Sequence, residues 1–244
     1  MTEILFDRKL LKQNQKRFAG VLCDHNFLYH EVANRIAQNL ESLNRGFESA
    51  LEIGARDSYL SSLVNANEMT QIGDAEELNF PAESFDLVLS NLNLHFINAV
   101  PQFLMQVKEV LKPGGIFIAS FFGEENLSEL AHVLYKAENE IYGGISPRMP
   151  PTIDVKTAAN LLQKAGFQNA ISDFDKIEVT YSNPKNLLKD LKFMGQGNIL
   201  TKRSRRFFTK KFLQKILENY QALYAAPEGG IKATFEIVTI AGWK

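Results

Sequence analysis

The sequence lacks the residues that mark a secreted, disulfide-stabilised or membrane-spanning protein. It holds one cysteine, Cys23, among 244 residues, which excludes an internal disulfide and a zinc site made of thiolates. No uncharged apolar run approaches the roughly 20 residues that a membrane-spanning helix needs. The N-terminal residues include two acids, Glu3 and Asp7, and no apolar segment of the kind found in signal peptides. These absences predict a cytoplasmic protein without an integral membrane segment.

Neither sign of charge is in excess. The 27 Lys and Arg against 28 Asp and Glu give a net charge of −1, whereas a dedicated nucleic-acid-binding protein carries a clear basic surplus. Hydrophobic residues make up 45% and charged residues 23%, which excludes disorder, collagen and coiled coil. We therefore expect a globular protein that does not bind nucleic acid.

Several catalytic motifs are also absent. None of the four histidines belongs to a His-x-Asp or His-x-Glu element of the kind found in iron sites. The sequence contains no Gly-x-Ser-x-Gly elbow and no phosphate-binding loop. It therefore predicts no metal site, and it argues against a hydrolase or a nucleoside triphosphatase.

Short apolar runs predict a parallel β-sheet. The runs at 50–54, 85–90 and 115–121 suit buried strands. A helical pattern at 100–111 separates the second run from the third, and Lys112-Pro113-Gly114 is expected to end that helix. Strand, helix and strand in alternation indicate an α/β fold, in which helices cover a parallel sheet.

The chain is expected to form a single domain with helices on either side of this core in the sequence. Two helical patterns fill the first forty residues, and others follow residue 122, one of them with Asp154 as its N-cap. The segment 233–240 is rich in β-branched residues and predicts a last strand. We divide the domain 1–244 into an N-terminal helical segment (1–45), a sheet core (46–122), the remaining core with a helical insertion before the last strand (123–232), and a final strand (233–244).

Polar residues gather at the ends of the predicted strands, where an open parallel sheet binds its ligands. Glu52 and Gly54 end the first strand, Asp74 precedes the second, and Asn91 follows it. An acid at a strand end can accept hydrogen bonds from ribose hydroxyls or an adenine amino group, and a glycine lets the backbone approach a ligand closely. The sequence predicts a nucleoside-sized hollow shared by the strand ends near Glu52, Asp74 and Asn91.

These motifs, taken in order, resemble the class I S-adenosylmethionine-dependent methyltransferases. The order is Glu-x-Gly at 52–54, Asp-Ala-Glu-x-Leu-x-Phe at 74–80, Ser-Phe-Asp-Leu-Val-x-Ser at 84–90 and Leu-Lys-Pro-Gly-Gly at 111–115. Within this superfamily the chain looks most similar to the complex I assembly factor 5 family and its bacterial relatives. The matching segments span nearly the whole chain and include 4–8, 92–96, 143–148, 188–191, 194–195, 233–237 and 242–244.

The resemblance implies a Rossmann-like class I methyltransferase sheet and S-adenosylmethionine as cofactor. It implies a protein or carrier substrate, because the broader group includes the malonyl-carrier-protein O-methyltransferase of biotin synthesis, and because the assembly factor is known as a hydroxylase of an arginine on a complex I subunit. It identifies no catalytic residue. The implied cofactor-binding residues are Glu52, Gly54, Ala55, Asp74, Ala75 and Asn91, and the implied substrate-binding residues are His95, Phe96 and Arg148.

Two departures from the family pattern bear on cofactor binding. The glycine-rich loop, usually Gly-x-Gly-x-Gly, here reads Gly54-Ala55-Arg56-Asp57-Ser58. The cation of Arg56 would repel a sulfonium at about 4 Å by about 4 kcal/mol for an effective dielectric constant of 20. Only 19 residues separate Gly54 from Asp74, enough for one helix and one strand where the usual fold has two of each. We expect one strand–helix unit to be missing, together with the acid that binds the ribose.

The sequence leaves three functions open. The chain could be a methyltransferase acting on a protein or carrier, an assembly factor toward a complex I subunit with arginine-hydroxylase-like activity, or a non-catalytic interaction protein that has lost cofactor binding. The cations at 202–211 could dock an acidic protein surface or form the solvated start of a helix. The cations at 8–17 could likewise contact a membrane or an acidic partner, or form the solvated face of a packed helix.

Overall fold

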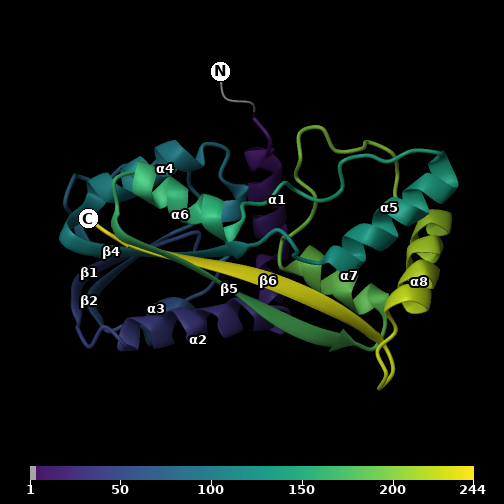
Figure 1. Ribbon diagram of the computed structural model, residues 1–244, viewed down its shortest axis with the longest axis horizontal. Helices are drawn as coiled ribbons and strands as arrows, with labels where there is room; N and C mark the ends of the chain where they lie inside the picture. Colours follow the sequence, from purple (N-terminus) through teal and green to yellow (C-terminus); the bar gives the residue numbers. More distant parts are fainter. Residues whose placement is uncertain (1–3) are drawn as a thin grey trace.

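A computed structural model describes residues 4–244 and shows a six-stranded sheet with helices on both faces (Figure 1). The strand order is β2-β1-β3-β4-β6-β5. The first four of these pair in parallel, and β6 runs antiparallel to both β4 and β5. This arrangement confirms the predicted α/β sheet. The strands are β1 (Phe47–Ile53), β2 (Ala66–Ile72), β3 (Phe85–Ser90), β4 (Leu111–Phe122), β5 (Gln168–Tyr181) and β6 (Ile231–Trp243).

Some helices begin or end at capping residues that the sequence supplies. As predicted, Asp154 caps α6, because its carboxylate accepts a hydrogen bond from the Thr157 amide at 2.9 Å. Gly143, at φ 68°, ends α5 in the left-handed conformation that glycine tolerates. The helices are α1 (Arg8–Phe18), α2 (Phe27–Glu41), α3 (Tyr59–Leu63), α4 (Val100–Val110), α5 (Ser128–Tyr142), α6 (Val155–Lys164), α7 (Pro184–Phe193) and α8 (Lys210–Tyr224), with short 3-10 segments η1 (Ala19–Asp24) and η2 (Leu94–Phe96).

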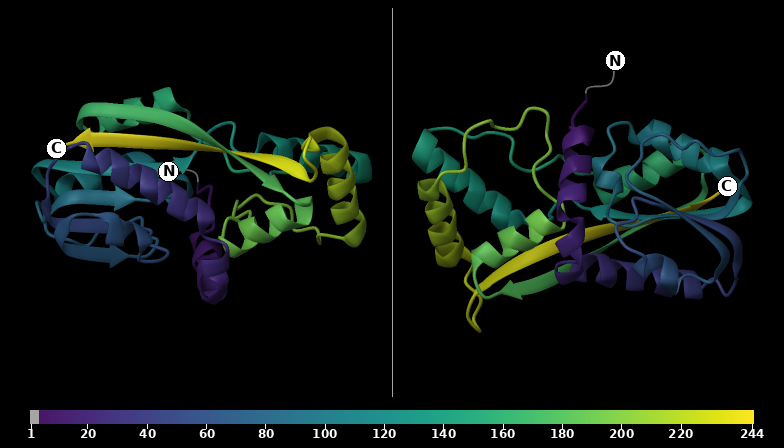
Figure 2. Two further views of the ribbon diagram at one scale, coloured as in Figure 1. Left: turned by 90° about the horizontal axis from the view of Figure 1, so that it is seen from below. Right: turned by 180° about the vertical axis from the view of Figure 1, so that it is seen from behind.

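The central strands are largely apolar because helices cover both faces of the sheet (Figure 2). Successive residues of β3 point to opposite faces. Leu87 and Leu89 pack on one face with Ile36 of α2, whereas Val88 packs on the other with Phe103 of α4. An apolar core therefore lies on each face of the sheet.

The predicted loss of one strand–helix unit is confirmed. Between Gly54 and Asp74 the chain forms only α3 and β2, which are five and seven residues long. β2 lies at the edge of the sheet beside β1, so the chain passes from this edge strand directly into the segment 73–80. That segment is thereby placed next to the ends of β1 and β3.

The predicted helical insertion is confirmed as α7 and α8, which lie between β5 and β6, and α8 packs beside α5 at one end of the molecule (Figure 1). Two predicted boundaries were wrong. Lys112-Pro113-Gly114 lies inside β4 rather than at the end of a helix, because Leu111 already pairs with Phe85. The last strand starts at Ile231, where it pairs with Tyr181 of β5. Within residues 4–244, no helix combines the length and the apolar character that crossing a bilayer requires.

Candidate functional site

The ends of β1 and β3 meet at a hollow that is almost completely filled. Glu52, Gly54 and Asn91, three of the implied cofactor-binding residues, line it together with Arg56 and the helix α2. Its volume is about 10 Å³, which is close to the minimum needed to hold one water molecule. Two of the three predicted strand ends, those near Glu52 and Asn91, thus share a space, but this space is too small for a nucleoside.

The side chain of Asn93 fills the space in front of Gly54. A Cβ atom placed on Gly54, which has φ +80°, would lie 2.4 Å from the Cγ atom of Asn93. Glycine is therefore required here because Asn93 packs against the backbone of this turn. Sequence reasoning missed Asn93, although it lies between two residues that were singled out, Asn91 and His95.

Arg56 lines the hollow beside Glu52 and Gly54. Its Nη1 donates a hydrogen bond to the carbonyl oxygen of Met194 at 3.2 Å, and its guanidinium lies 5.9 Å from the centre of the Tyr29 ring. The neighbouring Ala55 donates its amide hydrogen to Ile72. Ala55 and Arg56, which stand in the place of the glycine-rich loop, therefore bind backbone carbonyl groups of the protein itself.

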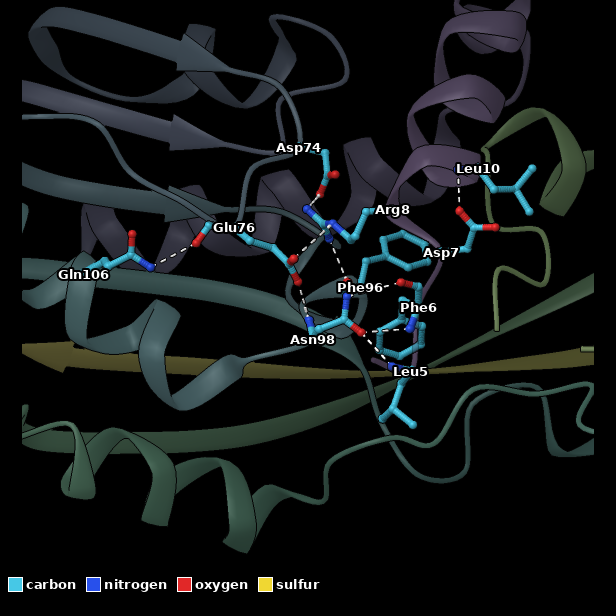
Figure 3. A network of polar contacts seen from close by, with 10 residues as sticks. All are labelled: Leu5, Phe6, Asp7, Arg8, Leu10, Asp74, Glu76, Phe96, Asn98 and Gln106. Atoms are coloured by element: carbon cyan, nitrogen blue, oxygen red, sulfur yellow. Dashed lines mark hydrogen bonds and ion pairs between the residues drawn. The ribbon is translucent and has the colours of Figure 1, made fainter. Parts of the chain in front are cut away.

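Asp74 contacts an arginine of the N-terminal helix (Figure 3). Arg8 Nη2 lies 2.5 Å from Asp74 Oδ1, and Arg8 Nη1 donates a hydrogen bond to the carbonyl oxygen of Phe96 at 2.7 Å. The Asp74 side chain is 1% exposed and that of Arg8 is 15% exposed. Arg8 thus does not belong to the solvated cations of this helix. Neither Asp74 nor Ala75 lines the hollow beside Glu52.

The N-terminal segment is held across the strand ends by further hydrogen bonds (Figure 3). Asn98 Oδ1 accepts from the amides of Leu5 and Phe6 at 2.9 and 2.8 Å, and the amide of Asn98 donates to Glu76. Phe6 precedes α1 and is 4% exposed. The matching segment 4–8 was the one sequence signal that pointed to this contact.

Glu52 is a buried carboxyl whose charge depends on pH near neutrality. Burial raises its pKa to about 7, while a hydrogen bond from Gln71 Nε2 at 2.9 Å works in the opposite direction. The nearby Asp57 raises the pKa further. Glu52 therefore carries only part of a negative charge at pH 7.

S-adenosylmethionine does not fit the residues as they stand. The hollow has room for about one water, Asn93 covers Gly54, and Arg8 neutralises Asp74. Some buried atoms around these positions nevertheless lack a hydrogen-bond partner among the described residues: Arg56 Nη2, Asp74 Oδ2 and Asn93 Nδ2. Binding would require these side chains to move.

A larger cavity lies beside the hollow, and we call it the tip cavity. Its volume is about 510 Å³, within the range of small-molecule sites. It contains all three implied substrate residues, His95, Phe96 and Arg148, although Arg148 is distant from the other two in the sequence. Its walls come from α1, the end of β4, α5, α7 and the segment 196–200. None of its described lining residues is acidic, whereas three are basic: Arg17, Arg148 and Lys192.

His95 lines this cavity as a neutral imidazole. Burial lowers its pKa to about 4, so the imidazole is neutral at pH 7. Its Nε2 lies 3.1 Å from Oε1 of Gln196, whose Nε2 in turn donates to the Tyr29 hydroxyl. A carbonyl oxygen only accepts, so this contact assigns the proton of His95 to Nε2. Nδ1 is then an acceptor, and it is buried without a partner among the described residues.

Arg148 belongs to the wall of the tip cavity and is held in place. Its Nη2 lies 2.7 Å from Glu138 Oε1, and its guanidinium lies 4.9 Å from the centre of the Phe212 ring. Glu138 also accepts hydrogen bonds from Ser146. Arg148 is therefore held in place with its charge compensated by Glu138, and it is not a free cation that could bind an anionic substrate by itself.

Comparison with known proteins gives matches over the whole length. A methyltransferase-domain family matches residues 36–119. The mitochondrial arginine hydroxylases NDUFAF5 of rat and human are each 33% identical over 98% of this chain and 77% of their own length. The malonyl-[acyl-carrier protein] O-methyltransferase of Gallionella capsiferriformans is 25% identical over 100% of this chain and 93% of its own. The YcgJ structure of Bacillus subtilis matches the fold with a TM-score of 0.54 at 15% identity, covering 88% of this chain and 98% of that one.

The ion pair of Arg8 with Asp74 predicts a large effect on stability. We expect Arg8→Gln to lower the free energy of unfolding by about 3–5 kcal/mol, because it leaves a buried carboxylate without its counter-ion. Adding Asp74→Asn should restore part of this loss. Urea unfolding measures both effects, with Lys9→Gln on the exposed face of α1 as the matched control, expected to cost under about 0.5 kcal/mol. Equal losses for Arg8→Gln and Lys9→Gln would contradict the assignment.

Glu52 predicts a pH dependence of stability. Between its unfolded value of 4.5 and its folded pKa of about 7, the folded protein binds a proton that the unfolded chain has lost, so stability falls as the pH rises through this window. Glu52→Gln removes this effect and keeps an acceptor for Gln71. Relative to the wild type, the variant should gain on the order of 3 kcal/mol from acid to mildly alkaline pH. Denaturant unfolding at a series of pH values tests this, and parallel pH profiles would refute it.

Proposed function

Because this chain belongs to the methyltransferase-fold family that contains the arginine hydroxylase NDUFAF5, we propose that it acts on another protein as an assembly factor for respiratory complex I. The tip cavity receives the group that this partner presents. The observation that supports the proposal is the contrast between the two spaces at the strand ends. The hollow of the cofactor site measures about 10 Å³, whereas the tip cavity beside it measures about 510 Å³.

The charges of the tip cavity favour a neutral or negatively charged group. Arg17, Arg148 and Lys192 line it, and only Arg148 has an ion-pair partner among the described residues, Glu138. An arginine side chain would enter among these cations with no described carboxylate in the lining to compensate its charge. Arginine hydroxylation, the chemistry named for the relatives, therefore stays a prediction for this chain. Its cytoplasmic location stays a prediction as well.

Methyl transfer is the second candidate, and specific atoms favour it. His95 lines the tip cavity as a neutral imidazole, and its buried Nδ1, like Asp74 Oδ2 and Asn93 Nδ2, has no hydrogen-bond partner among the described residues, so a small movement of these side chains would leave them free to bind a ligand. The relatives that methylate malonyl-carrier protein align with the whole chain. This function requires S-adenosylmethionine to displace Asn93 and Arg56, so binding of this molecule decides between the two candidates.

Calorimetric titration with S-adenosylmethionine distinguishes the assembly factor from the methyltransferase. We expect no saturable binding up to millimolar ligand, because the hollow holds no more than about one water and the cation of Arg56 lines it. The Gallionella malonyl-carrier-protein O-methyltransferase serves as the positive control. Saturable micromolar binding by this chain would establish the methyltransferase candidate in place of the first.

The role of the tip cavity is tested by filling it. Gly197 lines the cavity, and among the described residues a Cβ atom placed there meets only Asn14 Nδ2, at 3.8 Å, so Gly197→Trp adds bulk without displacing the core. In a strain that lacks the chromosomal gene, the wild type should restore assembled complex I on native gels, and Gly197→Trp should fail to do so at equal protein level.

Gly20→Trp is the matched control for this test. Gly20 lies in η1, a Cβ atom added to it would have no neighbour within 4 Å among the described residues, and it does not line the cavity. Its variant should therefore restore complex I like the wild type. Normal complex I in the deletion strain would refute the assembly role. Full restoration by Gly197→Trp would refute the part assigned to the cavity.

A further inference from the structure

One segment of the chain combines a dense positive charge with exposed aromatic rings. Residues 202–211 contain six Lys or Arg and no acid, although the chain as a whole carries a net charge of −1. The segment lies in the connection between α7 and α8 and includes the first two residues of α8 (Figure 1). We call it the basic aromatic loop.

Two adjacent phenylalanines of this loop face solvent. Phe207 is 92% exposed, more than any other large hydrophobic residue among those described, and Phe208 is 51% exposed. Phe208 is anchored, because its ring lies 5.1 Å from the ring of Phe212 and it lines the tip cavity. The loop therefore holds one ring on the protein and projects the other into solvent.

The cations of the loop differ in what they contact. Arg203 lies 3.2 Å from Asp7, and the guanidinium of Arg206 lies 4.9 Å from the centre of the Tyr142 ring. By contrast, three exposed cations around the phenylalanines form no ion pair among the described residues: Arg205, Lys210 and Lys211. The charges of Lys210 and Lys211 are available to an outside partner, while Arg205 also acts on the nearby carboxylate of Asp7, whose pKa it helps to lower.

We propose that the basic aromatic loop docks the protein on the surface of an anionic lipid bilayer. Phe207 enters the boundary between head groups and acyl chains, and Arg205, Lys210 and Lys211 contact the anionic head groups. An aromatic ring beside cations suits this boundary, which accepts it without a complementary pocket. A folded acidic protein would have to supply such a pocket for a ring that is 92% exposed.

Docking in this way brings the part of the tip cavity lined by Phe208 close to the bilayer. Phe208 lines that cavity together with Arg17 and Lys192, two further exposed cations without a described ion-pair partner. The cavity that the loop borders is therefore itself lined by apolar side chains and cations. The inference goes beyond the proposed function and does not depend on which group enters the cavity.

Vesicle sedimentation with the full-length protein tests the proposal. The wild type should pellet with vesicles of phosphatidylcholine and phosphatidylglycerol, should not pellet with phosphatidylcholine alone, and should dissociate as salt is raised. Lys210→Glu with Lys211→Glu should weaken partitioning by at least about fivefold for each charge, and Phe207→Ala should weaken it as well. Both acids lie in the first turn of α8, where negative charge favours the helix, so folding is preserved.

The matched control reverses two lysines at equivalent positions elsewhere. Lys156 and Lys185 are exposed and lie in the first turns of α6 and α7, so Lys156→Glu with Lys185→Glu changes the net charge equally. This variant should partition at least about fivefold more strongly than Lys210→Glu with Lys211→Glu. Equal losses in the two double variants would overturn the proposal, as would absence of wild-type binding to anionic vesicles.

A fluorescent variant separates insertion of the ring from adsorption by charge alone. Phe207→Trp places an indole at the exposed position, and Trp243, at the end of β6, provides a constant background. Its emission should shift to the blue with anionic vesicles and be quenched by brominated acyl chains. Vesicle binding without this shift would overturn the part assigned to Phe207. Binding of an acidic protein by a chain that ignores vesicles would overturn the proposal in favour of a protein partner.

Discussion

The ion pair between Arg8 and Asp74 joins the N-terminal helix to the ends of the parallel strands, and the arrangement of the site depends on it. A carboxylate as buried as Asp74 needs a counter-ion, and Arg8 reaches it while also donating a hydrogen bond to the Phe96 carbonyl. The backbone on either side of Arg8 is thereby drawn across the strand ends, where Asn98 binds it. The position of α1, and with it one wall of the tip cavity, follows from this contact.

The two spaces at the strand ends differ because different kinds of side chain fill them. At the hollow beside Glu52, Arg56 is part of the lining and Asn93 packs against the backbone of Gly54, so little volume remains for a ligand. The tip cavity is bounded largely by apolar side chains on separate elements, and these do not close on one another. A methyltransferase fold is thus combined here with a restricted cofactor site and an open substrate side.

Most of the central sheet could be predicted because its signals are local. Runs such as 85–90 are largely apolar, and helices on both sides require this. The length of the interval between Gly54 and Asp74 likewise revealed the missing strand–helix unit, since a chain cannot span more elements than its residues allow. The strand boundary at Leu111 was missed because pairing with Phe85 overrides the local Lys-Pro-Gly signal. Arg8 and Asn98 were missed because their partners are distant in the sequence.

The amino-acid sequence by itself determined the family, the α/β order of elements and the residues that gather at the strand ends, because motifs and apolar patterns are written along the chain. Only the tertiary structure decided which of these residues share a space. His95, Phe96 and Arg148 meet in the tip cavity, while Asp74 is separated from Glu52 and paired with Arg8. Such contacts join residues that are distant in the sequence, 66 positions apart in the pair of Arg8 and Asp74. They depend on burial and on which side chains fill the same volume, and the pattern of neighbouring residues in the sequence does not show this.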